Sequence, residues 1–314
     1  MKRLRAFELL PAAYPADFRA DQAALVDAWR QVHHVAQAVA EVGKSWGESR
    51  DDDSHSAFTS LPGSSMFWST GTGDGVVAGL DLDGPTISIE NGNEQIVIDP
   101  IGRDVAWLRE RVRLYATLLG GEARQDAVPA PDLPDHPVAS GAAVDADPAA
   151  LAGLAWIYDT TRALLERWSA AVRTRAVDGR HELVPRLWPH HFDLASLLVV
   201  GRDAAGAMSR TIGVGVTPPD AVDPSGYWYV SPWAADGSLE DMDWPELPIG
   251  TWVERGAGAM AVLRVEEVAA LAADDDHEAD VGSSAPEGAI AEFVAAAFNA
   301  CAEHFDQNEP HGTK

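Results

Sequence analysis

Cysteine and lysine are nearly absent from this chain of 314 residues. A single cysteine, Cys301, excludes an internal disulfide framework and any metal site built from several thiolates. Cys301 lies on the apolar face of a helix predicted near the end of the chain, so we expect a small buried hydrophobe there rather than a nucleophile. The only lysines are Lys2, Lys44 and Lys314, so arginine carries nearly all the positive charge.

Positive charge of either kind is scarce, because 23 Lys and Arg residues face 49 Asp and Glu residues and the formal net charge is −26. Such a field repels phosphate backbones and anionic lipids, which argues against a nucleic-acid or membrane-surface function. No apolar run reaches signal-peptide or membrane-spanning length, since Glu8 and Pro11 interrupt the N-terminal stretch. We therefore expect a globular cytoplasmic protein. Its preference for Ala, Arg, Asp and Gly over Lys, Asn and Ile is typical of a high-GC bacterial genome or of a salt-adapted one.

Catalytic and cofactor motifs of high specificity are also missing. The sequence contains no P-loop, dinucleotide fingerprint, nucleophile elbow or HExxH helix. The glycine-rich stretch 71–75 lies between predicted strands and leads into no helix, so it is typical of a turn rather than a phosphate-binding loop. The sequence thus leaves the cofactor, the metal content and the oligomeric state unknown.

What is present is a regular order of helices and strands in two halves, 1–123 and 150–314, joined by a Pro/Ala/Asp-rich linker at 124–149. In the first half, Asp21 can cap a helix with one apolar stripe, and a second helix is expected over 104–119. Four strands are predicted between these helices, over 65–69, 75–81, 86–90 and 94–98. The last two flank Asn91-Gly-Asn93, which favours a hairpin because Asn and Gly adopt positive φ at little cost.

The second half repeats this order, which is compatible with a pseudo-duplication. A helix begins at Asp147-Pro148 and carries an apolar stripe as far as Val172. Strand-like segments follow over 188–200, 209–217, 226–232 and 258–265, and Ser284-Ala-Pro-Glu287 is a capping-box signature that opens a last helix. Helix, antiparallel strands, helix, occurring twice, predicts an α+β fold with helices packed on one face of each sheet.

One histidine pair, His33 and His34, falls on the first predicted helix. Adjacent helical side chains point about 100° apart, so these two cannot converge on one metal ion. We expect His33 to border the apolar stripe and His34 to be solvated on the side of Asp27 and Glu41.

A second pair, His190 and His191, lies in the stretch Trp188-Pro-His-His-Phe-Asp-Leu-Ala195. If 189–200 is extended, His191 and Asp193 share one face of the strand and His190 points to the other. The predicted neighbouring strand alternates glycine with β-branched residues, and a symmetric turn would place its bare Gly213 and Gly215 beside Ala195 and Asp193. Trp228, on the next strand, is expected to cover these glycines.

Two interpretations of this cluster stay open. In the first, Trp188 and Trp228 fill the space, Asp193 accepts a hydrogen bond, and His191 is a core histidine. In the second, Trp188, His190, Trp228 and Tyr229 line a pocket in which Asp193 orients His191 as a general base. A metal site on His191 and Asp193 would need a third ligand, for which His181 and Glu182 are the nearest candidates in sequence.

The leading functional hypothesis is a binding or accessory protein for a small molecule or a partner, with an aromatic-lined pocket. The alternatives are a hydrolase- or isomerase-type enzyme that uses His191 and Asp193 as an acid–base pair, and a structural or interaction protein without a pocket.

Three short motifs occur at residues 191–195, 227–232 and 266–268 of this sequence. They read His-Phe-Asp-Leu-Ala, Tyr-Trp-Tyr-Val-Ser-Pro and Glu-Glu-Val, and in these and in its order of elements the chain resembles the uncharacterised bacterial family named domain of unknown function 5996. The chain departs from that family by bringing His191-Phe192 directly against Asp193, where the family has an intervening glycine-containing segment. The resemblance covers residues 21–305 and implies the architecture and the choice of site, but no reaction.

Overall fold

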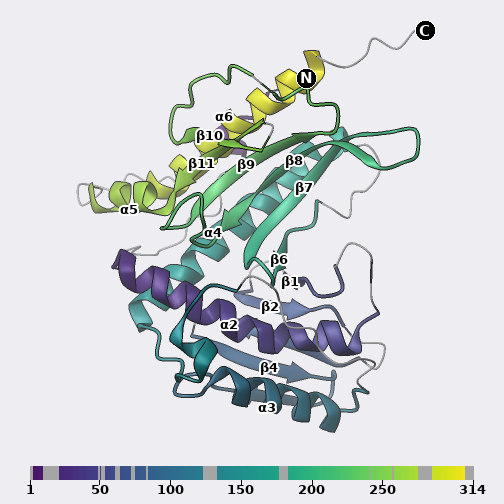
Figure 1. Cartoon of the computed structure of the whole chain (residues 1–314), viewed down its shortest axis with the longest axis vertical. Helices are drawn as coiled ribbons and strands as arrows, with labels where there is room; N and C mark the ends of the chain where they lie inside the picture. The colour runs from purple at the N-terminus through teal and green to yellow at the C-terminus, as the bar shows by residue number, and fades with distance from the viewer. Residues whose placement is uncertain are drawn as a thin grey trace. The chain divides into compact units, whose positions relative to one another are not determined.

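The structure is a computed structural model (Figure 1). It describes residues 3–9, 21–48, 50, 54–60, 64–71, 75–82, 84–122, 133–176, 183–240, 242–256, 258–274 and 285–307. Helices and antiparallel strands make up this part of the chain, which confirms the predicted α+β fold class. The described strands of one part of the chain are hydrogen-bonded in the order β10-β11-β9-β8-β7, and those of the other part in the order β6-β1-β2-β3-β4-β5.

The chain divides into two compact units, and each is assembled from separate segments. Unit 1 contains residues 1–17, 160–185 and 195–314, and unit 2 contains residues 18–159 and 186–194. The chain therefore passes from one unit to the other inside a helix, α4 (Pro148–Val172), and again inside a strand, β7 (Asp193–Arg202). The described part of the predicted linker, residues 133–149, contains a short 3₁₀ helix, η1 (Pro137–Ser140), and the start of α4.

Unit 2 packs two helices, α2 and α3, on an antiparallel sheet. Its strands are β6 (Arg186–Trp188), β1 (Phe58–Ser60), β2 (Met66–Ser69), β3 (Val77–Asp81), β4 (Thr86–Glu90) and β5 (Gln95–Ile98). The helix α2 (Gln22–Trp46) packs on β2 and β3, α3 (Val105–Leu118) packs on β3 and β4, and the two helices contact each other (Figure 1). The sequence predicted the helices α2 and α3 and the strands β2 to β5 of this unit, but not the short strands β1 and β6.

Local signals in the sequence explain where these elements begin. The Asp21 carboxylate accepts a hydrogen bond from the backbone N–H of Ala24 at 3.0 Å, so it caps α2 as predicted. Asp104 accepts one from Trp107 at 2.8 Å and caps α3, whose predicted range begins at this residue. A cap of this kind stabilises a helix by about 1 kcal/mol. The predicted hairpin is also confirmed, since Gly92 has a φ of 85° between β4 and β5.

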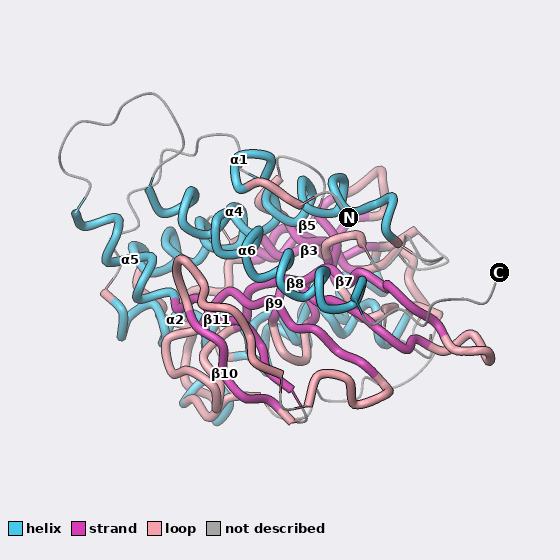
Figure 2. Tube along the Cα trace, turned by 90° about the horizontal axis from the view of Figure 1, so that it is seen from above, coloured by secondary structure: helices cyan, strands magenta, loops and turns pink. Residues whose placement is uncertain are grey.

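Unit 1 combines a second antiparallel sheet with the long C-terminal helix. Its strands are the part of β7 from Ala195, β8 (Met208–Thr217), β9 (Tyr227–Ala234), β11 (Gly258–Arg264) and β10 (Thr251–Arg255). Its helices are α1 (Ala6–Leu9), the second part of α4 with the 3₁₀ turn η2 (Arg173–Arg175), α5 (Val265–Asp274) and α6 (Ala285–Gln307). Figure 2 shows α6 lying along β8, β9 and β11, which it contacts.

In unit 1 the strands predicted over 209–217, 226–232 and 258–265 are confirmed as β8, β9 and β11. Each observed end lies within two residues of the predicted one. Cys301 is fully buried on α6, as expected, and this burial raises the pKa of its thiol. The strand β10 and the helix α5 were not predicted. Ser284, the predicted cap of the last helix, lies outside the described residues.

Candidate functional site

The stretch Trp188 to Asp193 forms a tight turn, so the predicted continuous strand over 188–200 is wrong. The strand β6 ends at Trp188 and β7 begins at Asp193. Between them the backbone N–H groups of His191 and Phe192 both donate to the Trp188 carbonyl, at 3.2 and 2.6 Å. Phe192 has a φ of 55°, in the left-handed region that L-residues rarely adopt. The alternation that placed His191 and Asp193 on one strand face therefore does not exist.

Side chains of α2 hold this turn from one side. The Pro189 carbonyl accepts hydrogen bonds from Gln37 Nε2 at 2.5 Å and lies 3.0 Å from His33 Nε2. His33 and Gln37 are four residues apart, so they occupy the same face of the helix. Both side chains are buried, so the polar contacts that fix the turn to α2 are shielded from water.

The helix α4 holds the same turn from another side. The Tyr158 hydroxyl donates to the Phe192 carbonyl at 2.6 Å and accepts from the Trp29 indole N–H at 2.7 Å. All three side chains are buried. Burial raises the pKa of Tyr158 well above its usual value, so its hydroxyl keeps the proton that it donates.

Phe192 is the buried member of the motif. Its ring stacks on His33 with centroids 5.3 Å apart and an interplanar angle of 14°, and it contacts Tyr158 at 5.3 Å. Burial lowers the pKa of His33 to about 4, although the bond to Pro189 opposes this shift. His33 is thus a neutral core residue at pH 7, as the position beside the apolar stripe indicated.

The other expectation for α2, a solvated His34, is wrong. His34 is buried and its Nε2 lies 2.8 Å from the Pro134 carbonyl. The prediction failed because α2 buries more of its circumference than one apolar stripe covers. Even Glu41 is buried on this helix, where it pairs with Arg109 and Arg113 of α3 at 2.9 and 2.7 Å.

The residues predicted as a catalytic pair lie at the surface of the turn and at its exit. His191 is exposed and its ring centroid lies 4.4 Å from that of the half-buried His190. Trp188 is half-buried and meets His190 edge to face at 5.9 Å. Asp193 is half-buried as the first residue of β7. His181 and Glu182, the proposed further metal ligands, lie outside the described residues.

Trp228 and Tyr229, the other predicted pocket residues, belong to unit 1 and point to opposite faces of β9. Trp228 is fully buried and donates its indole N–H to Thr161 Oγ1 of α4 at 2.8 Å. It pairs with Val216, whereas Tyr229 pairs with Gly215. A Cβ at Gly213 would lie 3.8 Å from Tyr229 and from Leu197, so these two side chains, rather than Trp228, cover Gly213.

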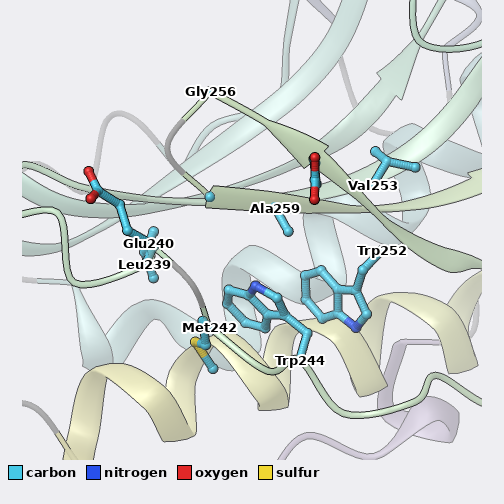
Figure 3. Close-up of a pocket in the computed structure, with 10 residues that line it drawn as sticks. Leu239, Glu240, Met242, Trp244, Trp252, Val253, Gly256 and Ala259 are labelled. Atoms are coloured by element: carbon cyan, nitrogen blue, oxygen red, sulfur yellow. The ribbon is translucent and has the colours of Figure 1, made fainter.

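A pocket that the sequence did not reveal lies in unit 1, between the β10–β11 hairpin and the segment before β10. Its volume is about 530 Å³. Figure 3 shows two tryptophan rings, Trp244 and Trp252, side by side between the hairpin and α6. The residues that line it are Leu239, Glu240, Met242, Trp244, Trp252, Val253, Glu254, Gly256, Gly258 and Ala259.

The two tryptophans are held in place by each other and by contacts with Pro245 and α6. Their rings stack with centroids 4.2 Å apart and an interplanar angle of 24°. The Trp252 indole N–H donates to the Pro245 carbonyl at 2.9 Å, and Trp244 lies 6.1 Å from the ring of His304 on α6. His304 Nε2 in turn lies 3.0 Å from the Ser238 carbonyl, which ties the start of the segment to the same helix.

The charge of the pocket lining is negative. Glu240 and Glu254 are its ionisable residues, and the lining contains neither Lys nor Arg. Glu254 lies two residues after Trp252 on β10, so both side chains project from the same face of the hairpin. Glu240 sits at the rim, with its carboxylate directed away from the two rings in Figure 3.

One signal in the sequence could have found this pocket. The segment Met242-Asp-Trp-Pro-Glu-Leu-Pro248 has neither helical nor strand periodicity, and it carries a tryptophan between acidic residues and prolines. Large aromatic residues on a connecting segment favour a binding site more than aromatics in a strand do. The tryptophans predicted to line a pocket, Trp188 and Trp228, lie on strands instead.

The comparisons with known proteins identify no relative: no family model, curated protein or solved structure matches the chain. The resemblance drawn from the three short motifs thus stays a prediction. Within the described part of the chain, no helix combines the length and the apolar character needed to cross a bilayer. Among the same residues, no group of three or more His, Cys, Asp or Glu side chains could hold a metal ion.

Proposed function

We propose that the protein binds a small organic molecule, and that the pocket of Trp244 and Trp252 is the binding site. The observation that carries this proposal is the stacked tryptophan pair, which is fixed by Pro245 and α6 beside a cavity of about 530 Å³. Small-molecule sites are typically preformed hollows of about 300–1,000 Å³ with aromatic walls and a few polar groups.

Preorganisation supports this assignment. An aromatic side chain that must be ordered on binding weakens affinity, because its lost rotamer freedom opposes association. The hydrogen bond from Trp252 to Pro245 and the mutual stacking already restrict both rings. Large apolar surface is therefore presented to a ligand at low entropic cost.

The proposal keeps the predicted class of function, an aromatic-lined binding site, and moves it to other residues. The acid–base alternative required an extended strand that turns His191 and Asp193 to one face. The turn between β6 and β7 removes that support.

A fragment screen by ligand-observed NMR tests the proposal. We expect fragments that bind the wild-type protein and lose about tenfold or more in affinity in Trp244→Ala, because removing a hot-spot tryptophan commonly costs at least that much. Trp244→Phe keeps a ring and should bind with intermediate affinity. The matched control is Trp233→Ala, which removes a tryptophan that is 48% exposed on β9 of the same unit and lies outside the pocket.

The urea midpoint of each variant establishes that it is folded before binding is compared. Retention of every fragment by folded Trp244→Ala and Trp244→Phe would overturn the proposed site.

A further inference from the structure

We infer that the ligand of this pocket is a small organic cation with a compact apolar body, such as a quaternary ammonium compound. This inference rests on the proposed function, since it names the chemical class that the same site would select. It is argued from the tryptophan pair, the charge of the lining and the apolar residues around it.

The tryptophan pair provides the surface that attracts a cation. Indole has the strongest cation–π attraction among the aromatic side chains, and the cation must approach the face of the ring to within about 6 Å of its centroid. The two rings are already in contact at 4.2 Å, so a ligand cannot enter between them. The outer faces of the pair are the surfaces left for a ligand.

The charges around the pair favour the same class. Glu254 projects from the face of β10 that carries Trp252, and Glu240 adds a second negative charge at the rim. The nearest arginine in sequence, Arg255, projects from the opposite face and lies 3.1 Å from Met260 Sδ. A net charge of −26 strengthens the attraction at long range, so an anionic ligand of the same shape should be rejected.

The remaining residues of the lining favour an organic cation over a metal ion. Leu239, Met242 and Ala259 supply apolar surface and no oxygen ligands from their side chains. Hard cations such as Ca²⁺ require about six to eight oxygen ligands. A methylated ammonium group needs none, because its charge is spread over carbon-bound hydrogens that contact apolar and aromatic surface.

Three probes that share a compact trimethyl head test this inference: choline, its uncharged carbon isostere 3,3-dimethylbutan-1-ol, and the anion 3,3-dimethylbutanoate, which carries its charge at the other end. Dissociation constants are measured by isothermal titration calorimetry on the full chain at low ionic strength. We expect choline to bind about tenfold or more tightly than the neutral isostere, because the two share one shape and differ in charge, and we expect the anion to show no binding.

Two variants assign the selectivity to residues. Glu254→Gln should weaken choline about two- to fivefold, the range expected for loss of one exposed charge, and leave the neutral isostere unchanged. Glu94→Gln removes the same charge from an exposed turn of unit 2 and should leave choline binding near its wild-type value. Trp244→Phe should weaken choline more than it weakens 3,3-dimethylbutan-1-ol.

The outcomes separate this inference from the proposed function. Equal, Trp244-dependent affinity for choline and its neutral isostere would overturn the cation inference and leave the proposed site standing. The same holds if the fragment screen yields Trp244-dependent ligands while choline fails to bind. If neither choline nor any fragment binds in a Trp244-dependent manner, both the inference and the proposed function are wrong.

Discussion

His33 is the residue whose protonation should limit the stability of unit 2. Its ring is buried between α2 and the turn after β6, and burial lowers its pKa from the usual 6.5 to about 4. Above pH 6.5 the ring is neutral in both the folded and the unfolded state. As the pH falls from 6.5 towards 4, the unfolded state takes up a proton that the folded state does not, so stability is lost.

We therefore predict that His33 alone removes roughly 3 kcal/mol of unfolding free energy between pH 6.5 and 4. Urea denaturation at a series of pH values measures the slope. His33→Gln should show a shallower slope in this window, while its stability at pH 7 falls through loss of the stack on Phe192. An identical slope in wild type and His33→Gln would show that His33 does not carry the effect.

Single residues were also where prediction from sequence was weakest. The burial of His34 and Glu41 depends on partners about 70 to 100 positions away, Arg109, Arg113 and Pro134, which no local pattern specifies. The identity of the aromatic that covers Gly215 depends on strand register. A shift by one residue exchanges Trp228 for Tyr229, because side chains alternate between faces.

At the scale of elements, the turn after β6 shows how tertiary contacts override a local pattern. The run Phe192 to Leu198 alternates in the manner of a strand, and the turn contains none of the Gly or Asn residues that signal positive φ. Its conformation is fixed by Gln37, Tyr158 and His33 instead. The helix caps Asp21 and Asp147 and the Asn91-Gly-Asn93 hairpin were predicted correctly, because their partners lie within four residues of each other.

The positive φ of Phe192 leads to an unusual order of stabilities for two variants. Phe192→Ala and Phe192→Gly each remove a buried ring, at a cost of about 3–5 kcal/mol. In Phe192→Ala the left-handed backbone still carries a penalty of roughly 1–2 kcal/mol, which glycine avoids. Glycine loses more backbone entropy on folding than alanine does, which offsets about 0.5–1 kcal/mol of this advantage. We expect Phe192→Gly to be the more stable variant, by up to about 1 kcal/mol.

Unfolding in urea measures the difference between the two Phe192 variants directly. The matched control is the pair Phe67→Ala and Phe67→Gly, since Phe67 is equally buried on β2 and its φ is not positive. There alanine should be the more stable, as in an ordinary strand. If alanine is also favoured at position 192, the turn does not constrain the backbone as the structure indicates.

For the whole molecule, fold class and charge were the properties that composition and periodicity could predict. The α+β class is confirmed because it depends only on which segments are helical and which extended. Which segments of the chain make up each unit could not be predicted in this way. Residues 186–194 join unit 2 although they follow a segment of unit 1, and this assignment arises from contacts between distant parts of the chain.

The net charge of −26 predicts how the stability of the whole chain responds to salt. Self-repulsion of excess charge destabilises a compact state. Raising NaCl from 0.01 to 0.1 M shortens the screening length from about 30 to about 10 Å, which weakens repulsion between distant carboxylates. The short ion pairs Arg109–Glu41 and Arg264–Asp223, at 2.9 and 2.7 Å, are partly buried and are screened less.

We therefore expect the unfolding free energy in urea to rise with NaCl over this range, by an amount of order 1 kcal/mol. A variant with Glu94, Glu122 and Glu246 each changed to Gln loses three exposed negative charges and should show a smaller rise, because self-repulsion grows faster than linearly with net charge. A stability that falls steadily as NaCl is added would mean that the short ion pairs outweigh the net repulsion. In that case acidic excess would not be the dominant electrostatic term in this fold.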